Sequence, residues 1–213
     1  VTLGLSRDPW RLIDWPDHLA EVGYFSAERF DPRAWRPITP HAAMANLDDR
    51  DGYWAAKIVS AFTDADLRVM VEQGRYQDPR AVDYLVEHLG RRRDVIARTW
   101  FDRIAPLDHF RRAGDRLRGE DLGVARGVYP AEGVRYRWRA RPVDAGRHGG
   151  AWTAWVVADT LELDLDLTPR AACDAEQPFL AVAWEVDRGD GWQGPATVYL
   201  AAAGSGRIVA LDH

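Results

Sequence analysis

The stretch VRYRWRARPV, residues 134–143, alternates strictly between apolar and basic side chains. Its apolar positions are Val134, Tyr136, Trp138 and Ala140, and its basic positions are Arg135, Arg137, Arg139 and Arg141. Successive side chains of a β-strand point to opposite faces of a sheet. The pattern therefore predicts a strand with one face in a hydrophobic core and the other in water.

A second alternating stretch, LELDLDL at residues 161–167, carries the opposite charge. Its leucines share one face, and its acidic residues share the other. Opposite charges on adjacent strands stabilise a sheet. We therefore expect residues 134–143 and 161–167 to lie in one sheet as neighbours.

Further strands are predicted around these two, separated by the turn signals DAGRHGG, DRGDGWQG and AGSG. Their ranges are 122–129, 151–158, 178–187, 195–202 and 206–211. Roughly seven short strands at this spacing are typical of an antiparallel sandwich of the immunoglobulin or fibronectin type III kind. Trp138, Trp155 and Trp184 are the expected core tryptophans.

The first half of the chain has a helical or irregular pattern instead, so the fold class is α+β. The polar stretch 111–120 contains Gly114 and Gly119 and predicts a boundary there. The expected domains are residues 1–118 and a β-sandwich of residues 122–213. Residues 1–47 are rich in Trp and Pro and are expected to wrap the helices. The expected anchors of this segment are Trp10, Trp15, Phe30 and Trp35.

Three helices are predicted, over residues 49–62, from Thr63 to about Gly74, and over 78–104. Thr63 and Asp66 have capping-box spacing, and Asp78-Pro79 is a typical helix start. The side chains expected to face inward on the first two helices are Trp54, Ile58, Ala61, Leu67, Met70 and Val71.

The third helix contains the basic run LGRRRDVIARTWF at residues 89–101. At 100° per residue, Arg93 falls inside the apolar stripe, and Arg92 and Arg103 flank it. A buried arginine needs a partner, so we expect Arg93 to pair with Asp51 or Asp48 of the first helix. The alternative is a pocket in which Arg92, Arg93 and Arg103 bind a carboxylate or phosphate ligand.

Net charge, cysteine count and the motifs present limit the classes of function that the chain can have. The 213 residues carry a net charge of −5, which argues against binding nucleic acid as a whole-protein property. A single cysteine, Cys173, excludes an intrachain disulfide, and no nucleotide-cofactor or metal-ligand motif is present. No apolar run is long enough for a transmembrane helix. Position 1 is Val, so the chain is expected to be a processed product, a domain excised from something longer, or a product of a non-AUG start.

Catalysis is left open, because no catalytic motif is recognisable. None of the four serines lies in GxSxG, and no two histidines have zinc-protease spacing. The alternative to a binding protein is a hydrolase, or a subunit of one, with a cleft between the helices and the sandwich. The candidate site residues, for a ligand or for this chemistry, are Arg92, Arg93, Arg103, Asp51, Lys57 and His109.

The helical part resembles a unit of uncharacterised, exported bacterial proteins. The resemblance covers residues 46–110 and lies in RDGYWAAKIV, AFTDADLR, YQDP, RRRDVIARTWF and PLDHF. In that family the unit is followed by a β-rich tail, which residues 178–213 resemble. No activity is associated with the family. The resemblance implies an exported, periplasmic or extracellular, protein.

These observations together lead to the expected function. We expect a non-catalytic binding module, without a cofactor, that recognises another protein chain or a surface polymer. Such a module is a possible subunit or fragment of a larger assembly.

Overall fold

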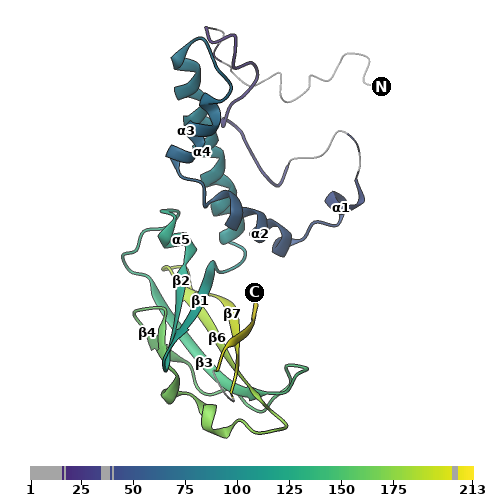
Figure 1. Ribbon diagram of the computed structural model, residues 1–213, viewed down its shortest axis with the longest axis vertical. Coiled ribbons are helices and arrows are strands. Elements are labelled where there is room, and N and C mark those ends of the chain that lie inside the picture. Colours follow the sequence, from purple (N-terminus) through teal and green to yellow (C-terminus); the bar gives the residue numbers. More distant parts are fainter. Residues whose placement is uncertain (1–15, 17, 35–38, 40, 203–205) are drawn as a thin grey trace. The chain divides into compact units, whose positions relative to one another are not determined.

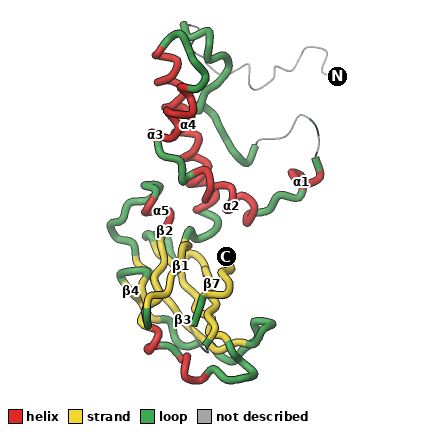
Figure 2. The backbone as a smooth tube through the Cα atoms, viewed as in Figure 1, coloured by secondary structure: helices red, strands yellow, loops and turns green. Residues whose placement is uncertain are grey.

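The computed structural model describes residues 16, 18–34, 39, 41–202 and 206–213. The expected anchors Trp10, Trp15 and Trp35 lie outside the described residues. The chain forms two compact units, one up to Trp100 and one from Phe101 to His213 (Figure 1). Long helices belong to the first and all strands to the second (Figure 2), which confirms the α+β class.

The helical unit contains α1 (Ala42–Ala45), α2 (Asp49–Val59), α3 (Asp64–Glu72) and most of α4 (Pro79–Phe101). Asp48 and Asp51 form a capping box at the start of α2. Thr63 and Asp66 form the predicted one at the start of α3. Each box satisfies backbone N–H groups that a helix start leaves unpaired.

Helices α3 and α4 share a small core. Leu67 and Val71 of α3 pack with Leu85 and Val86 of α4, and half-buried apolar residues surround them. Met70, which the sequence analysis placed inward, is 48% exposed. It lies beside the face of α3 that carries Leu67 and Val71 and does not take part in this core.

The inward face of α2 also differs from the prediction. Trp54 and Ile58 are 65% and 44% exposed, whereas Tyr53 and Ala56 are buried. The reason is Gly52, whose missing side chain leaves space for the ring of Trp100. Helix α2 therefore packs through small residues and Tyr53, and its bulky apolar side chains face outward.

Residues 25–30 are fastened to α4 by polar contacts; we call them the strap. The Ala27 N–H donates to Nδ1 of the buried His88 at 2.8 Å, and the Tyr84 hydroxyl donates to the Phe25 carbonyl at 3.0 Å. Arg92 donates to the Ser26 carbonyl and lies over the rings of Phe25 and Phe30. Phe30, one of the predicted anchors of the N-terminal segment, thus contacts α4 through Arg92.

The β-unit has two antiparallel sheets. The three-stranded sheet has the order β1 (Leu107–Ala113), β2 (Arg116–Asp121), β5 (Glu162–Asp164). The five-stranded sheet has the order β4 (Val156–Ala158), β3 (Arg135–Val143), β6 (Phe179–Asp187), β7 (Trp192–Ala201), β8 (Ile208–Asp212). Short helical turns, α5 (Leu122–Ala125), η2 (Leu165–Leu167) and η3 (Pro169–Ala172), connect some strands.

One hydrophobic core is shared by both sheets. Leu107, Leu117 and Leu163 come from the small sheet, and the buried tryptophans Trp138 and Trp184 come from the large one. As predicted, β3 turns its apolar positions into this core. Trp155, the third expected core tryptophan, is only half-buried and lies on the outer surface.

Three expectations about this half of the chain were wrong. Residues 111–120, where the sequence predicts a domain boundary, form most of the β1–β2 hairpin, because Gly114 turns with a φ of +61° and Leu117 points into the core. The start of the expected strand 122–129 is helix α5, which Asp121 caps. Strand β5 pairs with β2 and not with β3, and its Glu162 is held by Arg116 and Arg118.

Two helix glycines should respond oppositely to alanine. A Cβ at Gly90 meets neighbours only at 3.5–4.0 Å, whereas a Cβ at Gly52 overlaps the Trp100 ring. Gly90→Ala should stabilise by about 0.5–1 kcal/mol, because alanine lowers the cost of ordering a helix. Gly52→Ala should destabilise. Urea unfolding of both variants checks this, and equal effects would contradict the assigned packing.

The strap should loosen in mild acid. His88 accepts a hydrogen bond only when neutral, and burial and the nearby Arg91 lower its pKa below the usual value. The unfolded chain thus binds this proton more readily, so stability is full above about pH 6.5 and falls as the pH drops toward the lowered pKa. Unfolding measured between neutral and mildly acidic pH checks this. His88→Gln, which accepts without titrating, should flatten the slope; an unchanged slope would refute the role of His88.

Candidate functional site

The outer face of β3 carries an alternating stack of guanidinium and indole groups. Arg137 lies between Trp192 and Trp155, with 4.4 Å from its Cζ to each ring centroid. Arg139 lies between Trp155 and Trp152 at 4.4 and 4.8 Å. Arg141 lies on the other side of Trp152 at 4.5 Å, and Arg135 is 5.8 Å from Trp192. We call these four arginines and three tryptophans the Arg–Trp ladder.

Local structure explains how the ladder forms. The alternation of β3 puts its arginines on one face at a repeat of about 7 Å, which is twice the rise per residue of a strand. The segment around Thr153 lies along β3, because its N–H donates to the Ala140 carbonyl and its hydroxyl oxygen accepts from the Ala140 N–H. Trp152 and Trp155, the two tryptophans of WTAW, are thereby placed between successive arginines.

The ladder is an unusual outer face for a sheet. Each cation–π contact contributes about 0.5–2 kcal/mol, with the larger values in desolvated sites. The stacked groups also cover Ala181 and Ala183, which share this face and are each 1% exposed. Guanidinium and indole groups carry hydrogen-bond donors and no acceptors. The ladder is therefore suited to a ligand or partner that supplies acceptors.

The ladder arginines differ in their acidic partners. Arg135 pairs with Asp187 at 2.6 Å and Arg137 with Glu185 at 2.5 Å, both acids being opposite on β6. The Arg139 side chain has neither an ion pair nor a hydrogen bond within the described part of the chain. The Arg141 guanidinium has no acidic partner among the described residues, and it donates to backbone carbonyls of the β3–β4 connection at 3.2–3.5 Å.

Arg93, the first predicted site residue, has a structural environment. Its side chain is 17% exposed and pairs with Asp64 and Asp94 at 2.8 Å each. It also donates to the Phe62 carbonyl. A helix-to-helix ion pair exists, but its partner is Asp64 of α3 and not Asp51 or Asp48, and the pair is not buried, because the Asp64 side chain is 75% exposed. Those two acids cap α2, which turns them away from this role.

The other predicted site residues do not gather around Arg93. Arg92 holds the strap, Asp51 caps α2, and Lys57 lies half-buried in the last turn of α2. Arg103 and His109 belong to the other compact unit. The sequence analysis did not identify Trp152, Trp155 and Trp192 as partners of the β3 arginines. The spacing of the two tryptophans in WTAW could have indicated such a role.

His109 lies where the β1–β2 register shifts, with a positive φ of 48° that is uncommon for histidine. Its Nδ1 is 2.7 Å from the Glu120 carboxylate, and its N–H donates to Asp108. A histidine–carboxylate pair can hold or move a proton. Both of these partners belong to β1 and β2 themselves.

A buried ion pair stabilises the end of the β-unit near α5. Arg188 donates to Asp121 at 2.6 Å, and the two side chains are 14% and 4% exposed. Asp121 also caps α5 and accepts from the Tyr136 hydroxyl, whose pKa burial and the nearby carboxylate raise. Because the Arg188 side chain points inward, the Arg-Gly-Asp sequence at 188–190 is not displayed as a unit.

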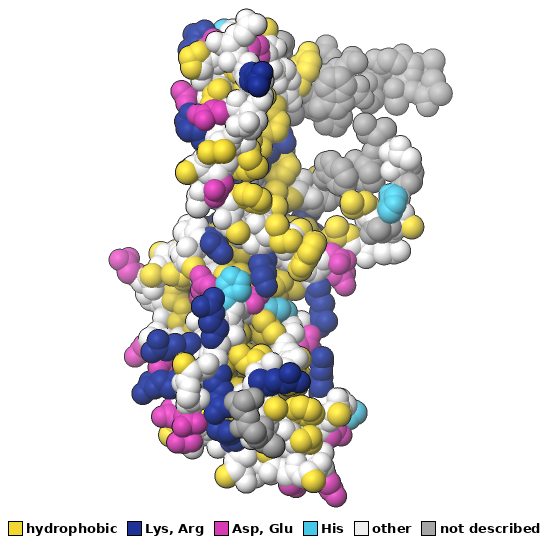
Figure 3. All heavy atoms as spheres, viewed as in Figure 1, with side chains coloured by type: hydrophobic (Ala, Val, Ile, Leu, Met, Phe, Trp, Pro, Cys, Tyr) yellow, Lys and Arg dark blue, Asp and Glu magenta, His cyan; other side chains and the backbone are white. Residues whose placement is uncertain are grey.

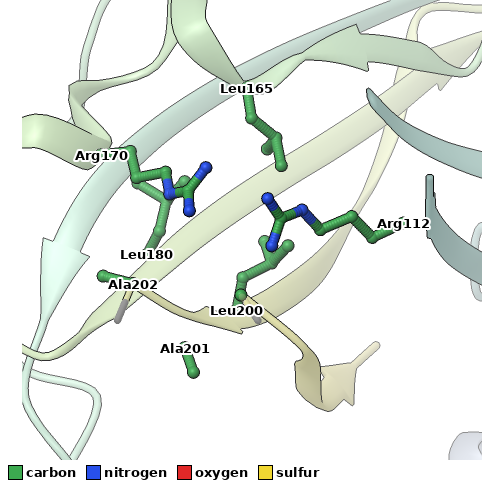
Figure 4. Close-up of a pocket in the computed structure, with 8 residues that line it drawn as sticks. Arg112, Leu165, Arg170, Leu180, Leu200, Ala201 and Ala202 are labelled. Atoms are coloured by element: carbon green, nitrogen blue, oxygen red, sulfur yellow. The ribbon is translucent and has the colours of Figure 1, made fainter. Parts of the chain in front are cut away.

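Arg112 and Arg170 point toward each other across a small hollow with Leu165, Leu180 and Leu200 around it (Figure 4). Both contact the Asp115 carboxylate, at 3.3 and 3.4 Å. The hollow has no room for a water molecule. It is a clamp between β1 and η3 rather than a ligand pocket.

No cluster of three or more metal-ligating side chains occurs among the described residues. Within the same residues, no helix is long and apolar enough to cross a membrane. Comparison with protein-family models, curated proteins and solved structures gives no match.

The Asp121–Arg188 pair should dominate the stability of its region. Arg188→Leu leaves a buried carboxylate without its counter-charge and should cost about 3 kcal/mol. Asp190→Asn, a change at the exposed tip of the same turn, should alter stability by less than about 0.5 kcal/mol. Chemical denaturation of the two variants makes the comparison. A loss below about 1 kcal/mol for Arg188→Leu would contradict the assigned burial.

Proposed function

We propose that this protein is a non-catalytic binding module that recognises another protein chain or a surface polymer through the Arg–Trp ladder. The observation that carries the proposal is the ladder itself. A solvent-facing sheet surface would ordinarily be covered by small polar side chains. Here it presents half-buried stacked tryptophans and arginines, the residue types that dominate binding energy at protein interfaces.

Surface charge is consistent with a local rather than a whole-protein attraction. Basic and acidic side chains are interspersed over the visible surface of the β-unit (Figure 3). The chain as a whole has a net charge of −5. A partner of the ladder would therefore be attracted by the arginines and tryptophans of that face and not by the charge of the whole protein.

We further infer that the β-unit is a sandwich of the immunoglobulin or fibronectin type III kind. The order β1-β2-β5 corresponds to strands A-B-E, and β4-β3-β6-β7 to C′-C-F-G. Buried Trp138 on β3 stands where such domains have a core tryptophan on strand C. Strand β8 is an addition beside β7. Domains of this architecture commonly serve as binding modules, which is an argument by analogy.

We also propose that the protein is bacterial and exported, on the resemblance of residues 46–110 described above. The hydrolase alternative is not carried forward. Arg92, Arg93 and Asp51, half of its candidate residues, make contacts that hold the helical unit together.

The proposal is tested by binding of the full chain to immobilised peptides and to neutral and acidic polysaccharides, read by biolayer interferometry. Trp152→Ala removes one indole from the ladder and should weaken binding of any true ligand at least tenfold. Tyr24→Ala, an exposed aromatic of the helical unit, is the matched control and should bind as the parent does. If no ligand is found, or if Trp152→Ala binds every ligand equally well, the proposal is wrong.

A further inference from the structure

Only two of the four ladder arginines have an acidic residue opposite them on β6. Strand β6 supplies a carboxylate opposite each of the first two arginines, namely Asp187 opposite Arg135 and Glu185 opposite Arg137. The residues opposite the last two arginines are alanines, Ala183 facing Arg139 and Ala181 facing Arg141. We call each arginine of β3 with the residue opposite it on β6 a rung. Two rungs contain an acid, and the other two, which we call the open rungs, do not.

No other charged group of the described chain takes the missing position. Across the sheet from Ala183, the next residue in register is Thr197 on β7, and the one after that is Asp212 on β8. The Asp212 carboxylate pairs with Arg147 at 3.1 Å. Across the sheet from Ala181, the next residue in register is Tyr199, whose ring lies under Arg147. Within the described residues, the Nε atoms of Arg139 and Arg141 are buried without a hydrogen-bond partner.

The stacking decides how a ligand can approach. Both faces of the Arg139 guanidinium are covered by Trp152 and Trp155, so a ligand can reach it only in the plane of its N–H groups. A carboxylate binds a guanidinium in that way, through parallel N–H···O bonds. Both faces of Trp152 are covered in turn by Arg139 and Arg141, so a neutral sugar ring cannot stack there.

We infer that the open rungs bind two carboxylates of an extended acidic segment of a partner protein, at alternate positions of that segment. Alternate side chains of an extended polypeptide repeat at about 7 Å, as do Arg139 and Arg141 on β3. The sequence of β6 already satisfies Arg135 and Arg137 with acids at this spacing. A long polyanion is disfavoured by the presence of only two arginines without an acid opposite on β6.

This inference rests on the proposed function, and its test uses two synthetic peptides of equal composition. One alternates threonine and glutamate over eight residues, and the other has four threonines followed by four glutamates. Isothermal titration of the full chain at low salt should show tighter binding of the alternating peptide by at least fivefold. Its affinity should fall as salt is raised, because the contacts are ionic.

Variants locate the site. Arg139→Gln should weaken binding of the alternating peptide at least tenfold, and so should Arg141→Gln. Arg111→Gln makes the same charge change at an exposed position of β1 in the other sheet and should leave the affinity within twofold. Near-ultraviolet circular dichroism shows whether each variant keeps its tryptophan packing. If Arg139→Gln does not, the comparison of the two peptides on the parent protein still decides.

The inference is overturned if both peptides bind equally, if neither binds, or if Arg139→Gln binds as the parent does. It is also overturned if a polyuronate or a single-stranded oligonucleotide binds the ladder more tightly than the alternating peptide. If a polyuronate or an oligonucleotide binds more tightly, the proposed binding function stands and only the inferred ligand class is wrong. The same holds if a neutral ligand binds the parent protein and Trp152→Ala abolishes that binding.

Discussion

The alternation of apolar and basic side chains along β3 is the constraint on which the β-unit depends. Its inner face contributes Tyr136, Trp138 and Ala140 to the core, and β6 packs beside it with Trp184 fully buried. Its outer face carries four arginines, whose charges cannot be left against a sheet without partners. Two of them are met by acids of β6, and all four lie on indole rings. The core and the candidate binding face are thus two consequences of one strand.

The helical unit uses arginine differently. Arg93 connects α4 to the start of α3, and Arg92 holds the strap through a carbonyl and two aromatic rings. Small residues let the helices approach, as Gly52 does under the ring of Trp100. The consequence is that Trp54 and Ile58 remain on the surface of this unit. Helical periodicity placed Trp54 and Ile58 on the inward face of α2, which was wrong, because a glycine and a tyrosine form the contact instead.

Several features followed from local rules and were predicted from sequence. The capping box at Thr63, the start of α4 at Pro79 and the alternation along β3 are each encoded by residues close together in the sequence. The β1–β2 hairpin was missed although Gly114-Asp115 is a recognised two-residue hairpin signal. Its many polar residues instead led to the prediction of a domain boundary there. The expected pairing of β5 with β3 was wrong for another reason. Opposite charges on two strands do not identify which acid pairs with which arginine. Glu162 of β5 pairs with Arg116 and Arg118 of β2, whereas the acids opposite the β3 arginines come from β6.

The sequence by itself determined the fold class, the helical and β-rich halves, and the two-faced character of β3, because each is encoded in the spacing of side chains along one segment. Only the tertiary structure decided what lies opposite each arginine. The register of β3 against β6 places acids at two rungs and alanines at two, and the return of the Trp152–Trp155 segment along β3 builds the stack. Both depend on contacts between residues far apart in the chain, where pairing is set by the common core that the two sheets must bury.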